Sequence, residues 1–128
     1  MLYAILCYND ETAVGGWSKA QDDQVMQQLG AVEAKLTAEG RLGPVARLMP
    51  TTTATTLRKT AGEPMVFDGP FAETREQFLG FYVVDCADLD AALATARDLA
   101  KANPGGGAYE IRPLAILRGD WQGASAAA

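Results

Sequence analysis

Apolar residues fill both alternating faces of the first segment, and this pattern predicts a strand over residues 1–8. One face would carry Leu2, Ala4, Leu6 and Tyr8, and the other Tyr3, Ile5 and Cys7. A strand with two apolar faces must be covered on both sides. Because the segment has no basic leader and is too short to cross a bilayer, we expect a cytoplasmic protein without a membrane span.

Two longer segments repeat apolar residues at helical spacing. The first would begin at a capping box formed by Ser18 and Gln21, and Gly40 would end it. Its apolar stripe consists of Val25, Leu29, Val32 and Leu36. The second would begin at Asp88 and stop in the Pro- and Gly-rich segment of residues 103–107. We expect its inward-facing residues to be Leu89, Leu93, Ala96 and either Leu99 or Ala100.

Further strands are predicted between and after the helices, over residues 41–48, 53–59, 65–67, 81–84 and 109–118. The threonines of residues 51–56 suit a partly exposed strand, with a phosphate- or sugar-binding cluster as the alternative. Pro113 would give the last strand an edge or a bulge. Residues 74–77 fit a second capping box on one helical turn ended by Gly80, which would also mark a bulge or close backbone approach.

This order of elements predicts an α+β fold, a ferredoxin-like βαββαβ subunit in one domain over residues 1–118. Residues 119–128 form a low-complexity segment that we expect to be a flexible tail. Two long helices cover only one face of such a sheet, although strands 1–8 and 81–84 are apolar on both. The uncovered face therefore predicts a homodimer.

Composition excludes several classes of function. Eleven basic and 16 acidic residues give the 128-residue chain a net charge of −5, which argues against binding nucleic acid or an acidic membrane. The chain contains no histidine and no Cys-x-x-Cys pair, so we expect no metal site. Cys7 and Cys86 are expected as free buried thiols, with a disulfide as the alternative. The glycine runs lack a nucleotide-binding pattern, and we expect no cofactor.

Asp68 is the candidate for acid–base chemistry, because it ends a short apolar strand and begins the turn Asp68-Gly69-Pro70-Phe71. Partial burial would raise the pKa of its carboxyl toward neutrality, as a general acid or base requires. The structural alternative is a turn in which the Asp68 side chain accepts hydrogen bonds from nearby backbone N–H groups.

Four further residues are candidates for ligand binding. Glu110 and Arg112 lie two apart and therefore on one face of the last strand, where Arg112 could clamp an anion. A cross-strand salt-bridge pair is the alternative for these two residues. Tyr8 and Tyr82 could offer hydroxyl groups to a ligand, and core packing is the alternative.

Several separated segments together resemble the DGPF-domain branch of the YCII-related family. They are residues 68–77 (DGPFAETREQ), 80–84 (GFYVV), 88–92 (DLDAA) and 109–114 (YEIRPL), with the opening strand and residues 53–58 also similar. The resemblance covers roughly residues 1–118. It implies a ferredoxin-like subunit that pairs into a dimeric α+β barrel.

The resemblance also frames two functional hypotheses. Relatives in the wider family are thought to act through a His–Asp pair, of which only the Asp68 position remains in this chain. The first hypothesis is a pocket for a small polar or anionic molecule near the dimer interface, with Asp68 as the acid–base group. The second follows from the association of DGPF-type proteins with extracytoplasmic-function sigma factors, and is a non-catalytic regulatory or interaction protein.

Overall fold

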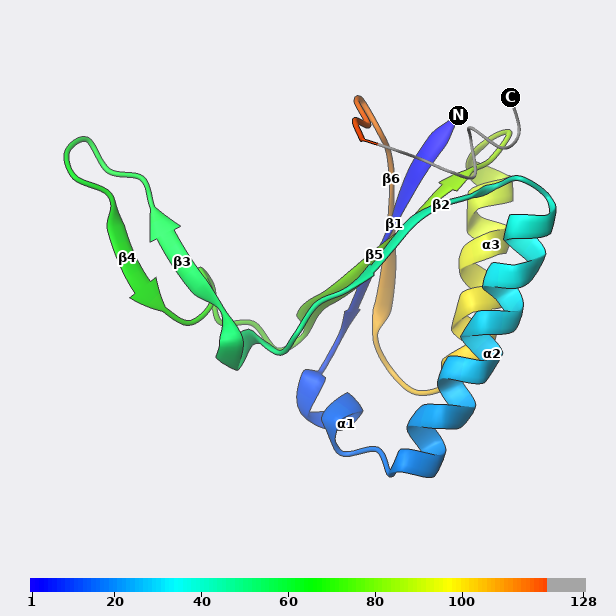
Figure 1. Cartoon of the computed structure of the whole chain (residues 1–128), viewed down its shortest axis with the longest axis horizontal. Coiled ribbons are helices and arrows are strands. Elements are labelled where there is room, and N and C mark those ends of the chain that lie inside the picture. The colour runs from blue at the N-terminus through cyan, green and yellow to red at the C-terminus, as the bar shows by residue number, and fades with distance from the viewer. Residues whose placement is uncertain (120–128) are drawn as a thin grey trace.

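The structure, a computed structural model, describes residues 1–119 and contains one main antiparallel sheet with two long helices on one of its faces (Figure 1). The strands run in the order β2-β5-β1-β6, which matches a βαββαβ ferredoxin-like arrangement. They are β1 (Leu2–Asn9), β2 (Leu42–Arg47), β5 (Gln77–Asp85) and β6 (Ala108–Pro113). The long helices are α2 (Lys19–Ala38) and α3 (Leu89–Ala102). The predicted α+β class is confirmed.

Both long helices begin where the sequence places them. The Ser18 hydroxyl accepts from the Gln21 backbone N–H at 3.1 Å, and the Gln21 side chain accepts from the Ser18 N–H at 3.0 Å. The Asp88 carboxylate likewise accepts from the Ala91 N–H at 2.9 Å. Gly40 follows α2 with a φ of 69°, a conformation that favours glycine. Local capping therefore fixes the starts of both helices.

The core lies between these helices and the sheet face that they cover. Ile5, Val84 and Leu99 are its most deeply buried large residues, and Leu36 of α2 packs with them. On α3 the buried residues are Ala92, Thr95, Ala96, Leu99 and Ala102. The prediction that Leu89 faces inward is wrong, because Leu89 is 51% exposed in the first turn. Apart from Leu99, the residues that α3 buries are small.

Strand register places two residue rows side by side beneath the helices. One row runs Val45–Tyr82–Ile5–Ile111 across β2, β5, β1 and β6, and the next runs Arg47–Gly80–Cys7–Tyr109. A Cβ on Gly80 would lie 2.2 Å from the Ala46 carbonyl oxygen, and the β1–β5 register shifts beside it. The expected bulge and close backbone approach at Gly80 are therefore confirmed.

The opposite sheet face carries the other half of the alternating pattern. Leu6 pairs with Phe81, Ala4 pairs with Val83, and the rings of Tyr8 and Phe78 lie 5.5 Å apart. Leu6, Tyr8 and Phe81 are half-buried, and Phe78 is 37% exposed. Neither α2 nor α3 covers this face, because both pack on the other side of the sheet.

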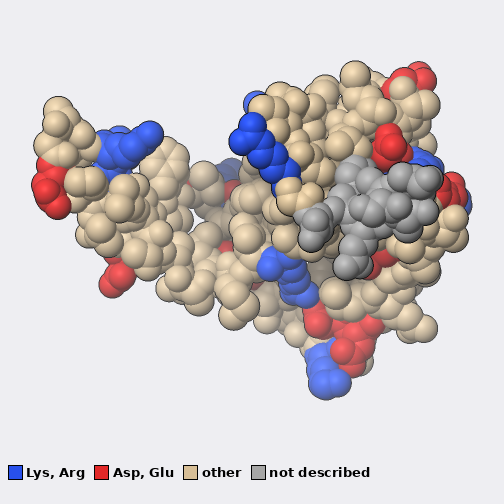
Figure 2. All heavy atoms as spheres, turned by 45° about the horizontal axis from the view of Figure 1, so that its top comes forward, with Lys and Arg blue, Asp and Glu red and all other residues tan. Residues whose placement is uncertain are grey.

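A second, two-stranded sheet projects from the body as an arm (Figures 1 and 2). Its strands are β3 (Thr55–Arg58) and β4 (Met65–Asp68), and a 3₁₀ turn, η1 (Thr51–Thr53), precedes them. The Glu11 carboxylate anchors the base of the arm, since it accepts from the Thr51 backbone N–H at 3.0 Å and from the Thr51 hydroxyl. Glu11 begins α1 (Glu11–Gly15), a short helix that precedes α2.

Three local predictions are wrong. Residues 74–77 form no helical turn, because Gln77 already belongs to β5 and its side-chain amide donates to the Thr74 carbonyl at 2.6 Å. The last strand ends at Pro113 and does not reach residue 118. The strand expected over residues 53–59 is shorter, since it spans Thr55–Arg58 and Thr53 belongs to the 3₁₀ turn. The predicted tail, apart from residue 119, lies outside the described residues.

Two features are absent from the described part of the chain. In the part of the chain that the structure describes, no helix is long and apolar enough to cross a membrane. Across residues 1–119, no group of three or more His, Cys, Asp or Glu side chains could hold a metal ion. Cys7 and Cys86 are both free thiols, as predicted; Cys86 is buried, whereas Cys7 is half-buried.

Candidate functional site

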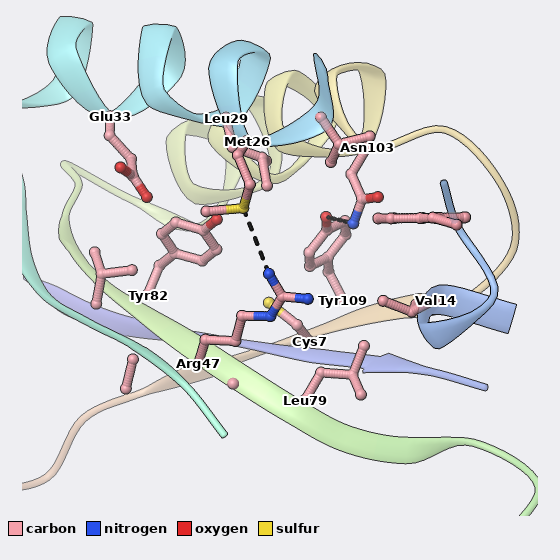
Figure 3. Close-up of a pocket in the computed structure, with 15 residues that line it drawn as sticks. Cys7, Val14, Met26, Leu29, Glu33, Arg47, Leu79, Tyr82, Asn103 and Tyr109 are labelled. Carbon is pink, nitrogen blue, oxygen red and sulfur yellow. Dashed lines mark hydrogen bonds between the residues drawn. The ribbon is translucent and has the colours of Figure 1, made fainter. Parts of the chain in front are cut away.

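A cavity with a volume of about 140 Å³ lies between α2 and the helix-covered sheet face (Figure 3). Its walls are mostly apolar: Met26 and Leu29 come from α2, Leu79 comes from β5, and Val14 and Trp17 come from α1 and the turn after it. The polar lining residues are Cys7, Glu33, Arg47, Tyr82, Asn103 and Tyr109. A mainly apolar space with a few convergent polar groups is the usual form of a small-molecule site.

The second cross-strand row explains why a cavity exists here. Gly80 and Cys7, which have no side chain and a small one, occupy its two central strands, whereas Arg47 and Tyr109 lie at its two ends. In the neighbouring row, Tyr82 and Ile5 fill the same central positions with large side chains. The cavity floor is therefore a gap in the side-chain layer set by strand register.

Asn103, at the carboxyl end of α3, lines this cavity and carries an unpaired side-chain acceptor. Its amide nitrogen donates to the Tyr109 hydroxyl at 3.4 Å, while its side-chain oxygen, Oδ1, is buried with no hydrogen-bond partner among the described residues. The Asn103 backbone N–H bonds to the Leu99 carbonyl at 3.1 Å and so fixes the residue at the helix end. A buried acceptor without a donor costs free energy, which a bound donor would recover.

Three hydroxyl or thiol groups in the cavity are neutral at physiological pH. Burial raises the pKa of the Cys7 thiol to about 12. Burial, followed by the nearby Cys7 and Glu33, also raises the pKa of Tyr82. For Tyr109, burial raises the pKa and outweighs the opposing hydrogen bond from Asn103. These groups can therefore donate protons in hydrogen bonds to a ligand, but they do not supply a charge.

One base and one acid complete the lining. Burial raises the pKa of the Glu33 carboxyl, which lies beside Tyr82 (Figure 3). Arg47 donates to the Met26 thioether sulfur at 3.6 Å and lies 3.8 Å from the Asp22 carboxylate. A thioether is a weak acceptor, and an ion pair with both side chains about half exposed contributes little. The Arg47 guanidinium can thus change partners at small cost.

Asp68 lies away from this cavity, at the end of β4 on the arm. Its side chain is exposed, so the expected partial burial is wrong. The turn after it is held by Gly69, which has a φ of 104° and donates its N–H to the Ala54 carbonyl at 2.8 Å. Asp68 extends into solvent because a two-stranded arm has no layer of its own to bury a carboxylate.

The other candidate residues are divided between the two sheet faces. Tyr82 lines the cavity, whereas Tyr8, Glu110 and Arg112 lie on the opposite face. Glu110 sits opposite Leu6 in the register, and Arg112 sits opposite Ala4. Both are exposed, and neither forms an ion pair with another residue in 1–119. The structure therefore does not bring the five candidates together in one site.

The sequence contained signals for two cavity residues that were missed. Glu33 follows Leu29 by four positions, which places a carboxylate on the edge of the apolar stripe of α2. Arg47 follows Val45 by two positions and shares its strand face. Asn103 carried no comparable signal, because helix-ending segments are commonly rich in Asn, Pro and Gly.

Comparison with known sequences now places this architecture in a family. Residues 1–118 match the YCII-related domain. One relative, described as the uncharacterized protein R00369 of Rhizobium meliloti (strain 1021), is 62% identical over 118 residues, which cover 92% of this chain and 95% of the relative. The family match includes every strand and helix that encloses the cavity. The chain therefore belongs to the YCII-related domain family.

Proposed function

We propose that this protein binds a small, mainly apolar molecule carrying one anionic or polar group, in the cavity between α2 and the sheet. The observation that carries the proposal is the row Arg47–Gly80–Cys7–Tyr109, which leaves an open floor between two polar ends. The size is suitable for one ring, since an apolar cavity of about 150 Å³ can hold benzene. Arg47 supplies the positive charge for an anionic group.

This proposal relocates the expected ligand pocket. The sequence hypothesis had Asp68 beside the ligand near a dimer interface, whereas the cavity lies inside one subunit and is lined by Tyr82. Any acid–base role in the cavity would belong to Glu33, whose pKa is raised by burial. A role for Asp68 stays a prediction, and it would concern the arm.

Benzoate provides a direct test, because it combines one ring with a carboxylate. We expect its titration, followed by ligand-observed NMR, to give saturable binding to the wild-type protein. Leu29→Phe should weaken this binding at least tenfold, because the larger side chain fills the cavity from α2. Asp68→Asn should leave the affinity unchanged.

Gln28→Phe is the matched control for the test, since Gln28 is exposed on α2 and does not line the cavity. No saturable binding by the wild-type protein would refute the proposal. Equal loss in Leu29→Phe and Gln28→Phe would also refute the assigned location. Loss of benzoate binding in Asp68→Asn would indicate that the ligand binds at the arm, beside Asp68.

We further propose that two subunits form a homodimer through the sheet face opposite the helices. The half-buried Leu6, Tyr8 and Phe81 and the exposed Phe78 support this arrangement. Sedimentation of the wild-type protein at micromolar concentration should give a dimer. Phe78→Glu should weaken the dimer at least tenfold, because it puts a charge into the contact. A compact wild-type monomer would contradict the proposal.

The arm supports a second candidate function, that of a regulatory or interaction protein. Its exposed apolar residues are Leu57, Met65, Val66 and Phe71. The guanidinium carbon of Arg58 lies 5.8 Å from the centroid of the Phe71 ring. Two short strands are marginally stable alone, so such an arm would gain stability from a partner. Pull-down with wild-type and Val66→Ser protein tests this role. A specific partner should bind the wild-type protein and not the variant. Identical eluates would show that the arm does not bind a partner through Val66.

A further inference from the structure

Two groups of polar residues, Arg47 and the Asn103–Tyr109 pair, lie at different ends of the cavity, while Tyr82 belongs to the neighbouring row with Glu33 beside it. Arg47 and Tyr109 occupy opposite ends of one residue row, three strand spacings apart. That separation corresponds to about 14 Å between their Cα atoms. Their side chains face the same side of the sheet, and both line the cavity (Figure 3). A ligand lying along this row would contact Arg47 with one of its ends and Tyr109 with the other.

The Arg47 end selects a planar anion. Arg47 is the single base among the cavity-lining residues that the structure describes. Its present partners are a thioether sulfur and a carboxylate at 3.8 Å, which leave most of its five N–H donors available. A carboxylate can accept two parallel hydrogen bonds from one guanidinium. Glu33, the acid of the lining, lies beside Tyr82 and disfavours an anion on that side of Arg47, whose charge also acts on Tyr82.

The Asn103–Tyr109 end selects a hydroxyl group. The unpaired Oδ1 of Asn103 requires a donor. The Tyr109 oxygen already accepts from the Asn103 amide, and its raised pKa keeps its own proton available for donation. A ligand hydroxyl can accept from Tyr109 and, once the Asn103 side chain turns its buried Oδ1 toward the cavity, donate to that oxygen as well. Asn103 and Tyr109 carry no carboxylate, so this end of the cavity does not favour an amine cation.

Between the ends, the cavity is apolar. Gly80 and the neutral Cys7 thiol form the floor, and Met26 and Leu29 of α2 form the roof. We propose that the ligand class is a single-ring hydroxy acid, with its carboxylate on Arg47 and its hydroxyl on the Asn103–Tyr109 pair. This inference rests on the proposed function of the cavity and specifies its ligand.

Three related probes test the inference: 3-hydroxybenzoate, 4-hydroxybenzoate and benzoate. We expect the wild-type protein to bind the better hydroxybenzoate at least tenfold more tightly than benzoate, because the hydroxyl pairs the buried Oδ1. Asn103→Ala should reduce this preference to within twofold. Arg47→Gln should weaken all three acids about tenfold and leave the hydroxyl preference intact.

Tyr109→Phe is a second test at the hydroxyl end, in case Asn103→Ala disturbs the end of α3. Tyr109→Phe retains the ring and should also reduce the preference for hydroxybenzoate over benzoate. Circular dichroism establishes that each variant is folded. A wild-type preference below twofold would overturn this inference while benzoate binding still supports the proposed function. A tenfold preference that survives in both Asn103→Ala and Tyr109→Phe would overturn it as well. Absence of binding by all three acids would refute both proposals.

Discussion

Replacing Leu99 with alanine is expected to destabilise the protein by about 2–5 kcal/mol, the usual cost of truncating a fully buried leucine. Leu99 has 0% exposure in α3 and belongs to the core cluster with Ile5 and Val84. Because neighbouring α3 core residues are small, they cannot move far enough to fill the space that Leu99 leaves. Chemical denaturation of the two proteins measures the difference in unfolding free energy.

Leu89→Ala is the matched control for this prediction, because it makes the same change in the first turn of α3. Leu89 is 51% exposed, so its truncation should change the unfolding free energy by less than about 1 kcal/mol. Equal effects of the two substitutions would show that α3 does not bury the face that carries Leu99.

Replacing Gly80 with alanine is expected to have the second largest effect, with a loss of about 1–3 kcal/mol from overpacking. The added Cβ would lie 2.2 Å from the Ala46 carbonyl oxygen and 3.1 Å from the Arg47 Cα. These contacts are with backbone atoms of β2, which cannot rotate away as a side chain can. The strand must therefore shift, and it carries Arg47 with it. Thermal unfolding and benzoate titration together measure the two consequences, and benzoate affinity should fall at least tenfold.

Gly30→Ala is the control for the Gly80 prediction. A Cβ on Gly30 meets nothing within 4 Å, and the residue lies within α2. Alanine is a better helix former than glycine, so this variant should be more stable by about 0.5–1 kcal/mol. A Gly80→Ala protein as stable as the wild type would mean that β2 and β5 are not packed as closely as this register requires.

The sequence could predict most of the fold because its signals there are local. Ser18 and Asp88 start their helices through caps within three residues, and both caps are present. Alternation on both faces of β1 likewise predicted a sheet with an apolar side that the two long helices leave uncovered. Residues 74–77 show the limit of such reasoning. Their capping pattern predicted a helical turn, but Gln77 pairs with Asn9 of β1 and belongs to a strand.

The sequence could not predict the site, because the site depends on register between distant strands. Asp68 stood out through its turn, yet the arm carries it into solvent. Tyr82 and Tyr8 were equal candidates, and only the pairing of β5 with β1 placed one beneath the helices and the other on the opposite face. A shift of one residue in either strand would move that strand's tyrosine to the other face of the sheet.

The sequence by itself determined the family, the α+β class, the helix starts and the two-sided apolar character of the central strands. Tertiary structure alone decided that Arg47, Cys7 and Tyr109 share a row with Gly80, and that Asn103 closes its end. The physical reason is that caps and periodicity act within one segment, whereas a cavity forms where segments far apart in the chain leave space unfilled. That space depends on the volumes and register of all of them at once.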